Sequence, residues 1–148
     1  MAVDLPPAFG WVVLTAVAYG VLNVWMSIQV GKARKRYNVP YPKLYAIESE
    51  NKDANLFNCV QRGHQNCLEV MPVFFLFLIL GGLQHPIASS IFGVVYSVGR
   101  FFYFTGYSTG VPKNRLTYGK YNMLGLLGLM FCTLSLAWHL LFKAPNHE

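Results

Sequence analysis

Three long stretches of this chain contain no charged side chain. They lie between Asp4 and Lys32, between Glu69 and Arg100, and between Lys120 and Lys143. Each is longer than the roughly 20 residues that an α-helix needs to cross the hydrocarbon core of a bilayer. Only 12% of the residues are charged, whereas soluble domains contain about 25%. The chain cannot cover a water-facing surface in the usual way, so we predict an integral membrane protein.

The middle stretch is interrupted by the segment Gly81-Gly82-Leu83-Gln84-His85-Pro86, whose proline would not continue a helix. It marks the end of one span and the start of another. The sequence therefore predicts four helices, over residues 7–33, 57–83, 87–109 and 119–142. The first has no basic residue before it and is longer than the apolar part of a signal peptide, so we expect a retained span. A chain of 148 residues has the length of one domain. We expect residues 1–148 to form a single all-α transmembrane domain, a four-helix bundle.

Basic residues gather in two of the connecting segments. Six lie between residues 32 and 52 and three more come after the third predicted helix: Lys32, Arg34, Lys35, Arg36, Lys43 and Lys52, then Lys113, Arg115 and Lys120. The positive-inside rule places both segments in the cytosol and both termini on the opposite side. Contact with lipid headgroups accounts for most of these lysines. Nucleic-acid binding does not suit residues held at a membrane surface.

The second predicted helix carries polar residues in its first turns. Its apolar part, residues 70–83, is only about 21 Å long, which is shorter than the ~30 Å hydrocarbon core of a bilayer. A helix that crosses the bilayer must therefore include the polar turns as well. Arg62, Asn66 and Glu69 are spaced i, i+4 and i+7, so they share one face, and His64 lies among them. Ionisable groups here are costly to insert and usually face a bundle interior, a partner or a site. A structural polar seam is the alternative, but a face with both charges and an amide favours a site.

The third predicted helix has a matching face. Arg100, Tyr103 and Tyr107 are spaced i, i+3 and i+7, and Arg115 follows in a short basic loop. Aromatic residues at a membrane interface normally anchor a helix in the bilayer. Anchoring alone does not account well for two tyrosines that share one helix face with an arginine. Together with the second helix they suit a small zwitterion, because arginine grips carboxylates bidentately and Glu69 can receive an ammonium group. The three cysteines fit no zinc spacing, and we expect no metal.

The segment Phe57-Asn58-Cys59-Val60-Gln61-Arg62-Gly63-His64-Gln65-Asn66-Cys67-Leu68-Glu69 resembles the signature of the MAPEG family, the membrane-associated proteins in eicosanoid and glutathione metabolism. Residues 32–37 and 99–107 match two further blocks, and the resemblance runs from about residue 9 to residue 140. It implies a homotrimer in the endoplasmic reticulum membrane. It also implies glutathione as co-substrate, held in a cleft between neighbouring subunits that opens toward the cytosol and the lipid.

The resemblance further implies roles for individual residues. The positions that match glutathione contacts of the family are Arg34, Arg62, His64, Asn66, Glu69, Tyr103 and Tyr107. Arg115 matches the arginine that stabilises the thiolate, in a loop one residue longer, and we count Tyr103 with it as catalytic. Lys35 stands where leukotriene-forming members carry a second arginine implicated in catalysis. Val70 replaces a tyrosine that contacts glutathione in those members.

The expected activity is a membrane-bound glutathione transferase that also acts as a glutathione-dependent lipid peroxidase. A free thiol has a pKa of about 8.5, and a guanidinium in a partly dehydrated cleft would favour the nucleophilic anion. Its targets, lipophilic electrophiles or lipid hydroperoxides, would arrive through the bilayer. The alternative is a non-enzymatic lipid-binding scaffold of the lipoxygenase-activating type, which would not require Arg115, Tyr103 and the Arg62 face together. A transporter or channel would need polar faces across the whole bilayer, which residues 73–80 and 125–136 do not offer.

Overall fold

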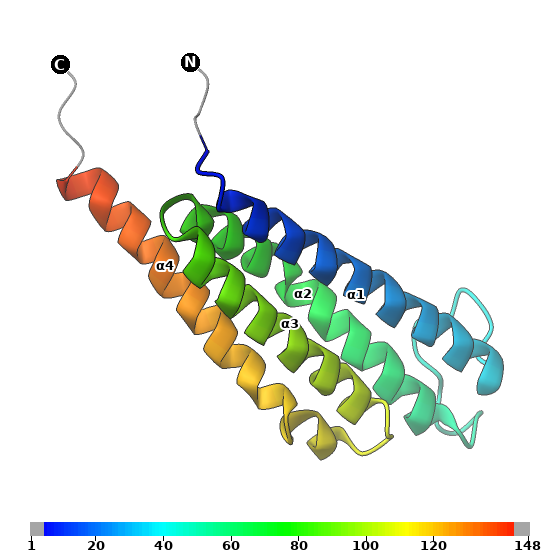
Figure 1. Ribbon diagram of the computed structural model, residues 1–148. Helices are drawn as coiled ribbons and strands as arrows, with labels where there is room; N and C mark the ends of the chain where they lie inside the picture. The colour runs from blue at the N-terminus through cyan, green and yellow to red at the C-terminus, as the bar shows by residue number, and fades with distance from the viewer. Residues whose placement is uncertain (1–4, 144–148) are drawn as a thin grey trace.

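The computed structural model describes residues 5–143, and this part of the chain is helical without strands. Its long helices are α1 (Phe9–Arg36), α2 (Ala54–Gln84), α3 (Pro86–Tyr107) and α4 (Asn122–Phe142). Two short 3₁₀ helices, η1 (Pro112–Leu116) and η2 (Gly119–Tyr121), connect α3 to α4. The predicted all-α, four-helix fold is confirmed (Figure 1).

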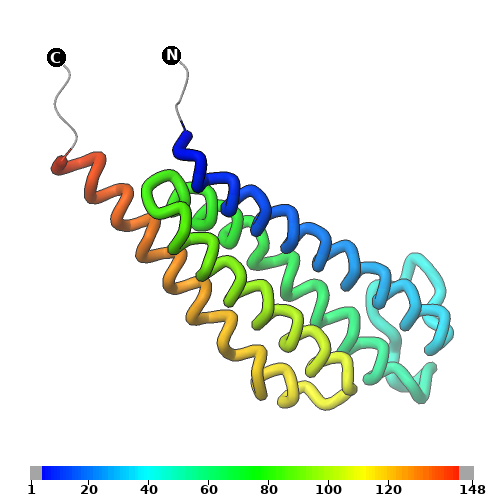
Figure 2. Tube along the Cα trace, in the orientation of Figure 1, coloured from blue at the N-terminus to red at the C-terminus, as the bar shows by residue number. Residues whose placement is uncertain are grey.

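The four helices form an up-and-down bundle in which α2 and α3 each pack against both α1 and α4. Figure 2 shows α2 turning directly into α3 at one end of the bundle, where α1 also starts and α4 ends. Residues 37–53 and the η1–η2 segment lie at the opposite end (Figure 1). We call this opposite end the basic end, because most of the lysines and arginines are found there.

The helix ends differ from the predicted ones for local reasons. α1 continues to Arg36 rather than stopping at residue 33, since basic side chains in a last turn are favoured by the helix dipole. α3 stops at Tyr107 rather than 109 because Gly110 has φ +83° and Pro112 follows. The region predicted as the start of the fourth helix forms η2 first, so α4 begins at Asn122.

All four helices are long and apolar enough to cross a membrane. α2 has 31 residues and is about 46 Å long, well beyond the ~30 Å hydrocarbon core. α3 and α4, with 22 and 21 residues, are about 33 Å and 32 Å long. The surplus length of α2 therefore leaves turns near its start for polar residues at one bilayer surface.

The interior of the bundle contains an aromatic group beneath those turns. Tyr19, Phe74 and Tyr96 are fully buried, with the Phe74 and Tyr96 rings stacked at 4.3 Å and the Tyr19 and Phe74 rings 4.4 Å apart. Valines and leucines along the outer faces of the helices are exposed, as suits side chains that meet lipid rather than water. These three rings, one each from α1, α2 and α3, pack the helices together next to the polar turns of α2.

Candidate functional site

The polar face of α2 is organised around an exposed ion pair. Arg62 Nη1 lies 2.7 Å from Glu69 Oε1, and 41% and 46% of the two side chains are exposed. Asn66 Nδ2 donates to Glu69 Oε2 at 3.4 Å. These contacts follow from the helical period, because residues four and seven positions apart lie on one face. The structure thus brings the three predicted residues together in the first half of α2.

Arg100 joins this face to α3. Its Nη1 donates to Asn66 Oδ1 at 2.9 Å, and its Nε donates to the Tyr96 hydroxyl at 3.0 Å. The side chain is 3% exposed, so these bonds satisfy a cation that would otherwise be buried at high cost. Since arginine can only donate, Asn66 must turn its oxygen to Arg100 and its NH₂ group to Glu69. The sequence places Arg100 in the face that suits a zwitterion, but it does not show that the donors of Arg100 join α2 to α3. Its position within an otherwise apolar span was the available signal of burial.

The other wall of the site is aromatic and ends at an arginine. The Tyr103 ring centroid lies 5.3 Å from the Arg100 guanidinium carbon and 5.9 Å from the Tyr107 ring. Beyond it, the Arg115 guanidinium carbon lies 5.1 Å from the Tyr107 ring centroid. All three of Tyr103, Tyr107 and Arg115 are half-buried. The site therefore runs from the α2 ion pair, across α3, to η1.

Close backbone packing fixes η1 and η2 on α3. A Cβ atom at Gly106 would lie 2.5 Å from the Asn114 carbonyl oxygen, and one at Gly119 would lie 2.6 Å from Tyr103 Cα. These approaches are possible only without a side chain. Arg115 Nη1 also donates to the Pro112 carbonyl at 2.8 Å. The position of Arg115 is thus determined by the α3 backbone and by its own 3₁₀ turn.

Three predicted site residues lie elsewhere in the subunit. Arg34 is buried, donates from Nη1 to the Lys43 carbonyl at 2.6 Å, and stacks its guanidinium 5.0 Å from the Phe57 ring. Lys35 is exposed in the last turn of α1. His64 is half-buried and, two residues from Arg62, points about 200° around α2 from it. The structure does not bring these residues to the Arg62 face of the same chain.

Donor and acceptor capacity remains free at this site. In the described contacts Arg62 uses one of its five N–H donors, and the Glu69 carboxylate accepts two bonds. An exposed ion pair contributes little net stability, so a ligand can replace it at low cost. Carboxylates would bind Arg62 and an ammonium group would bind Glu69. Cys59 and Cys67 are buried free thiols that offer no nucleophile to this surface.

Fold and site together define a class: a bundle of four apolar helices with a polar, arginine-containing site at its basic end. A sequence model of the MAPEG family matches residues 12–135. The chain belongs to the MAPEG family and is a multi-pass membrane protein.

Individual relatives agree with this assignment. The chain is 34% identical over 111 residues to microsomal glutathione S-transferase 2 of Homo sapiens, covering 72% of this chain and 71% of that protein. It is 33% identical to the Bos taurus protein of the same name, with 70% of each chain covered. It is also 34% identical over 135 residues to leukotriene C4 synthase of Cavia porcellus, covering 89% of this chain and 85% of that protein. A closer resemblance to microsomal glutathione S-transferase 3, suggested by the motifs, stays a prediction.

Proposed function

We propose that this protein is a membrane-bound glutathione transferase that uses glutathione as co-substrate. One observation carries the proposal: the Arg62/Asn66/Glu69 face of α2 continues through Arg100 to the tyrosines of α3 and to Arg115. The family membership and the names of the relatives support the same activity.

The donor set fits glutathione, a peptide with two carboxylates, one ammonium group and a thiol. Arg62 binds a carboxylate, Glu69 receives the ammonium group, and the Asn66 NH₂ group, oriented by Arg100, supplies a further donor. The phenols of Tyr103 and Tyr107 line the path from this face to Arg115. The peptide is thus held by its charged groups at α2, with its thiol directed toward η1.

Bound glutathione supplies the nucleophilic sulfur. Arg115 favours the anionic form of that thiol by its positive charge, which near neutral pH raises the reactive fraction of a group whose free pKa is about 8.5. The Tyr103 hydroxyl donates a hydrogen bond to the same sulfur. Addition of the sulfur to a lipophilic electrophile gives the thioether conjugate. Attack on the terminal oxygen of a lipid hydroperoxide breaks the O–O bond, releases the lipid alcohol and oxidises the sulfur to a sulfenic acid, which a second glutathione converts to the disulfide and water. Both substrates dissolve in the bilayer beside the helices.

The separate positions of Arg34, Lys35 and His64 support a site shared between subunits. Within one chain His64 points away from Arg62, so one ligand could contact both only if His64 came from a neighbouring subunit. A homotrimer in the endoplasmic reticulum membrane, with the basic end in the cytosol, is the arrangement we propose. The whole chain, residues 1–148, acts as one domain in it.

A non-enzymatic lipid-binding scaffold is the second candidate. It would need apolar grooves between helices, and such a groove lies beside Trp11 and Val94 on α1 and α3. A scaffold has no need of Arg115 at the end of a row of tyrosines, which favours the enzyme.

A glutathione titration of the detergent-solubilised protein, followed by thiolate absorbance in the ultraviolet, tests the binding face. We expect Arg62→Ala and Glu69→Gln each to raise the glutathione Kd at least about tenfold, because each removes one partner of a charged hydrogen bond. The matched control is Glu50→Gln, which breaks the exposed Lys43–Glu50 bridge of 2.8 Å at the same end of the bundle. It should leave the Kd unchanged. Wild-type affinity in both Arg62 and Glu69 variants would reject this face as the site.

A further inference from the structure

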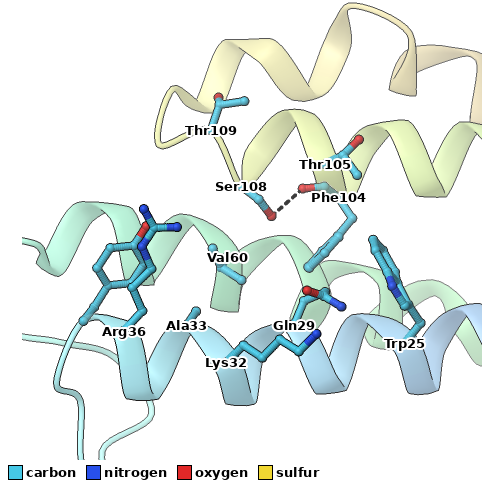
Figure 3. A pocket seen from close by; sticks show the side chains of 11 residues that line it. Trp25, Gln29, Lys32, Ala33, Arg36, Val60, Phe104, Thr105, Ser108 and Thr109 are labelled. Carbon is cyan, nitrogen blue, oxygen red and sulfur yellow. Dashed lines mark hydrogen bonds between the residues drawn. The ribbon is translucent and has the colours of Figure 1, made fainter.

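A second groove lies at the basic end, between the last turns of α1 and of α3 (Figure 3). Its volume is about 430 Å³, and Val60 of α2 contributes to its lining. None of the residues that line it belongs to the candidate glutathione site. Phe104 and Ser108 of the groove follow Tyr103 and Tyr107 by one position each, so they face a neighbouring side of α3. The groove is a separate feature of the molecule.

The α1 wall of the groove is amphipathic along its length. Trp25, Gln29, Lys32 and Arg36 are spaced i, i+4, i+7 and i+11 and form one stripe. At the inner end the Trp25 ring packs 5.6 Å from the Phe104 ring. At the outer end are the two cations, and Figure 3 shows Ser108 and Thr109 on the opposite wall. From Trp25 to Arg36 the stripe rises about 16 Å.

The two cations at the outer end have no acidic partner in the described chain. The salt bridges among residues 5–143 are Lys43–Glu50 and Arg62–Glu69, and no acidic residue lines the groove. Lys32 and Arg36 are both exposed. Arg34 lies about 200° away on α1 and is engaged with the Lys43 carbonyl. The basic run at the end of α1 is thus divided, with one arginine used inside the fold and two cations left for the groove.

Trp25 fixes the level of the groove relative to the bilayer. Tryptophan is enriched at the membrane interface, and basic residues at the end of a span lie among the headgroups. The groove therefore presents aromatic surface where acyl chains begin and positive charge where phosphates lie. A phospholipid has the same order of groups along its length.

We propose that this groove binds an anionic phospholipid of the leaflet at the basic end. Lys32 and Arg36 hold its phosphate, Arg36 by parallel N–H donors and Lys32 as a point charge. The first part of an acyl chain packs against Trp25 and Phe104. The proposal does not rest on glutathione binding, because the two sites share no lining residue.

Tryptophan quenching by brominated lipids tests the proposal in the full chain. The chain has three tryptophans, Trp11, Trp25 and Trp138, so Trp11→Phe with Trp138→Phe leaves Trp25 as the reporter. This protein is reconstituted in phosphatidylcholine vesicles containing a small, equal fraction of either phosphatidic acid or phosphatidylcholine brominated near the headgroup. We expect the brominated phosphatidic acid to quench Trp25 with at least about tenfold higher apparent affinity than the brominated phosphatidylcholine.

Charge variants in the same background identify the groove. Lys32→Gln with Arg36→Gln should reduce phosphatidic acid quenching to the level of phosphatidylcholine. The matched control, Lys113→Gln with Lys120→Gln, removes two exposed cations from the other basic segment and should keep the preference. Millimolar inorganic phosphate should not compete.

Three results would overturn the proposal. The first is equal quenching by the two lipids in the unmodified groove, and the second is a preference for phosphatidic acid that survives the Lys32/Arg36 double variant. The third is competition by inorganic phosphate, which would indicate a site for free anions. The comparison of the two lipids in the unmodified groove decides the question even if the double variant does not fold.

Discussion

Arg62 of α2 and Arg100 of α3 are the same type of residue, yet they play different parts in the structure. Arg100 is 3% exposed and bonded to Asn66 and Tyr96, so it is part of the framework. The side chain of Arg62, in contrast, is 41% exposed and forms an ion pair with Glu69. The Arg62/Asn66/Glu69 set follows from helical spacing, and the sequence predicts it. The Arg100–Asn66 bond joins residues 34 positions apart and depends on how α2 packs on α3, which spacing does not determine.

Arg115 is the residue that most directly separates binding from chemistry. Its guanidinium lies beside Tyr107, whereas we propose that the Arg62–Glu69 pair holds the charged groups of glutathione. If its main interaction is with the sulfur anion, Arg115→Ala removes an interaction that is stronger in the reactive state. We expect kcat to fall about 100-fold or more, with less than about a fivefold change in glutathione Kd. Steady-state kinetics measure kcat, and equilibrium dialysis with labelled glutathione measures Kd, because this variant should lose the thiolate absorbance.

Lysine at position 115 provides the control for charge. Arg115→Lys should recover part of the lost rate and part of the thiolate absorbance, because a point charge still favours the anion but lacks the planar fork. An Arg115→Ala enzyme with normal turnover at saturating glutathione would exclude this role and direct attention to Tyr103.

At the scale of elements, the uncharged stretches of the sequence predict the four helices, whereas local chemistry determines the residue at which each helix ends. The break at His85 and Pro86 is visible in the sequence, and α2 and α3 meet there. The 3₁₀ turns between α3 and α4 could not be predicted in the same way. Gly106 of α3 and Gly119 of η2 permit the close backbone contact between these turns and α3, and a glycine in a sequence does not show which backbone it touches.

Gly106→Ala should therefore disturb the site from the α3 side. The new Cβ would meet the Asn114 carbonyl oxygen at 2.5 Å and Arg115 Cα at 3.1 Å, so η1 must move and take Arg115 with it. We expect at least about a tenfold loss of kcat, since small displacements of a catalytic group are costly, and a lower melting temperature in detergent. Gly31→Ala is the matched control, because a Cβ there meets nothing within 4 Å. Full activity in Gly106→Ala would show that the position of η1 does not matter for catalysis.

For the whole molecule, the important asymmetry is between the two ends of the bundle. α1 and α2 have 28 and 31 residues, while α3 and α4 have 22 and 21. The long helices overshoot a ~30 Å core, so the turns at their basic end, with Arg36 on α1 and Arg62 on α2, reach beyond it. Site and groove consequently lie at one membrane surface, a location that hydropathy and charge placement already predict. How copies of the chain meet is not encoded in either pattern.

The question of subunit contact can be tested through the two faces of α2. In one chain Arg62 and His64 point about 200° apart, and Arg34 is on α1. If a site is built between subunits, one subunit contributes the Arg62 face and its neighbour contributes Arg34 and His64. A subunit with one damaged face can then still complete a site with its neighbour through its other face.

Mixed oligomers of two variants that bind glutathione weakly should therefore regain activity, measured at a glutathione concentration that saturates the wild type but not the variants. One variant carries Arg62→Ala and the other carries Arg34→Ala with His64→Ala; they are co-expressed with different tags and purified through both. In a trimer that contains both variants, one of the three interfaces combines two intact faces, so we expect about a third of the wild-type glutathione transferase activity. Arg62→Ala mixed with Glu69→Gln is the matched control, because both changes damage the same face and no interface is restored. If the first mixture is as inactive as the control, the site is contained within a single subunit.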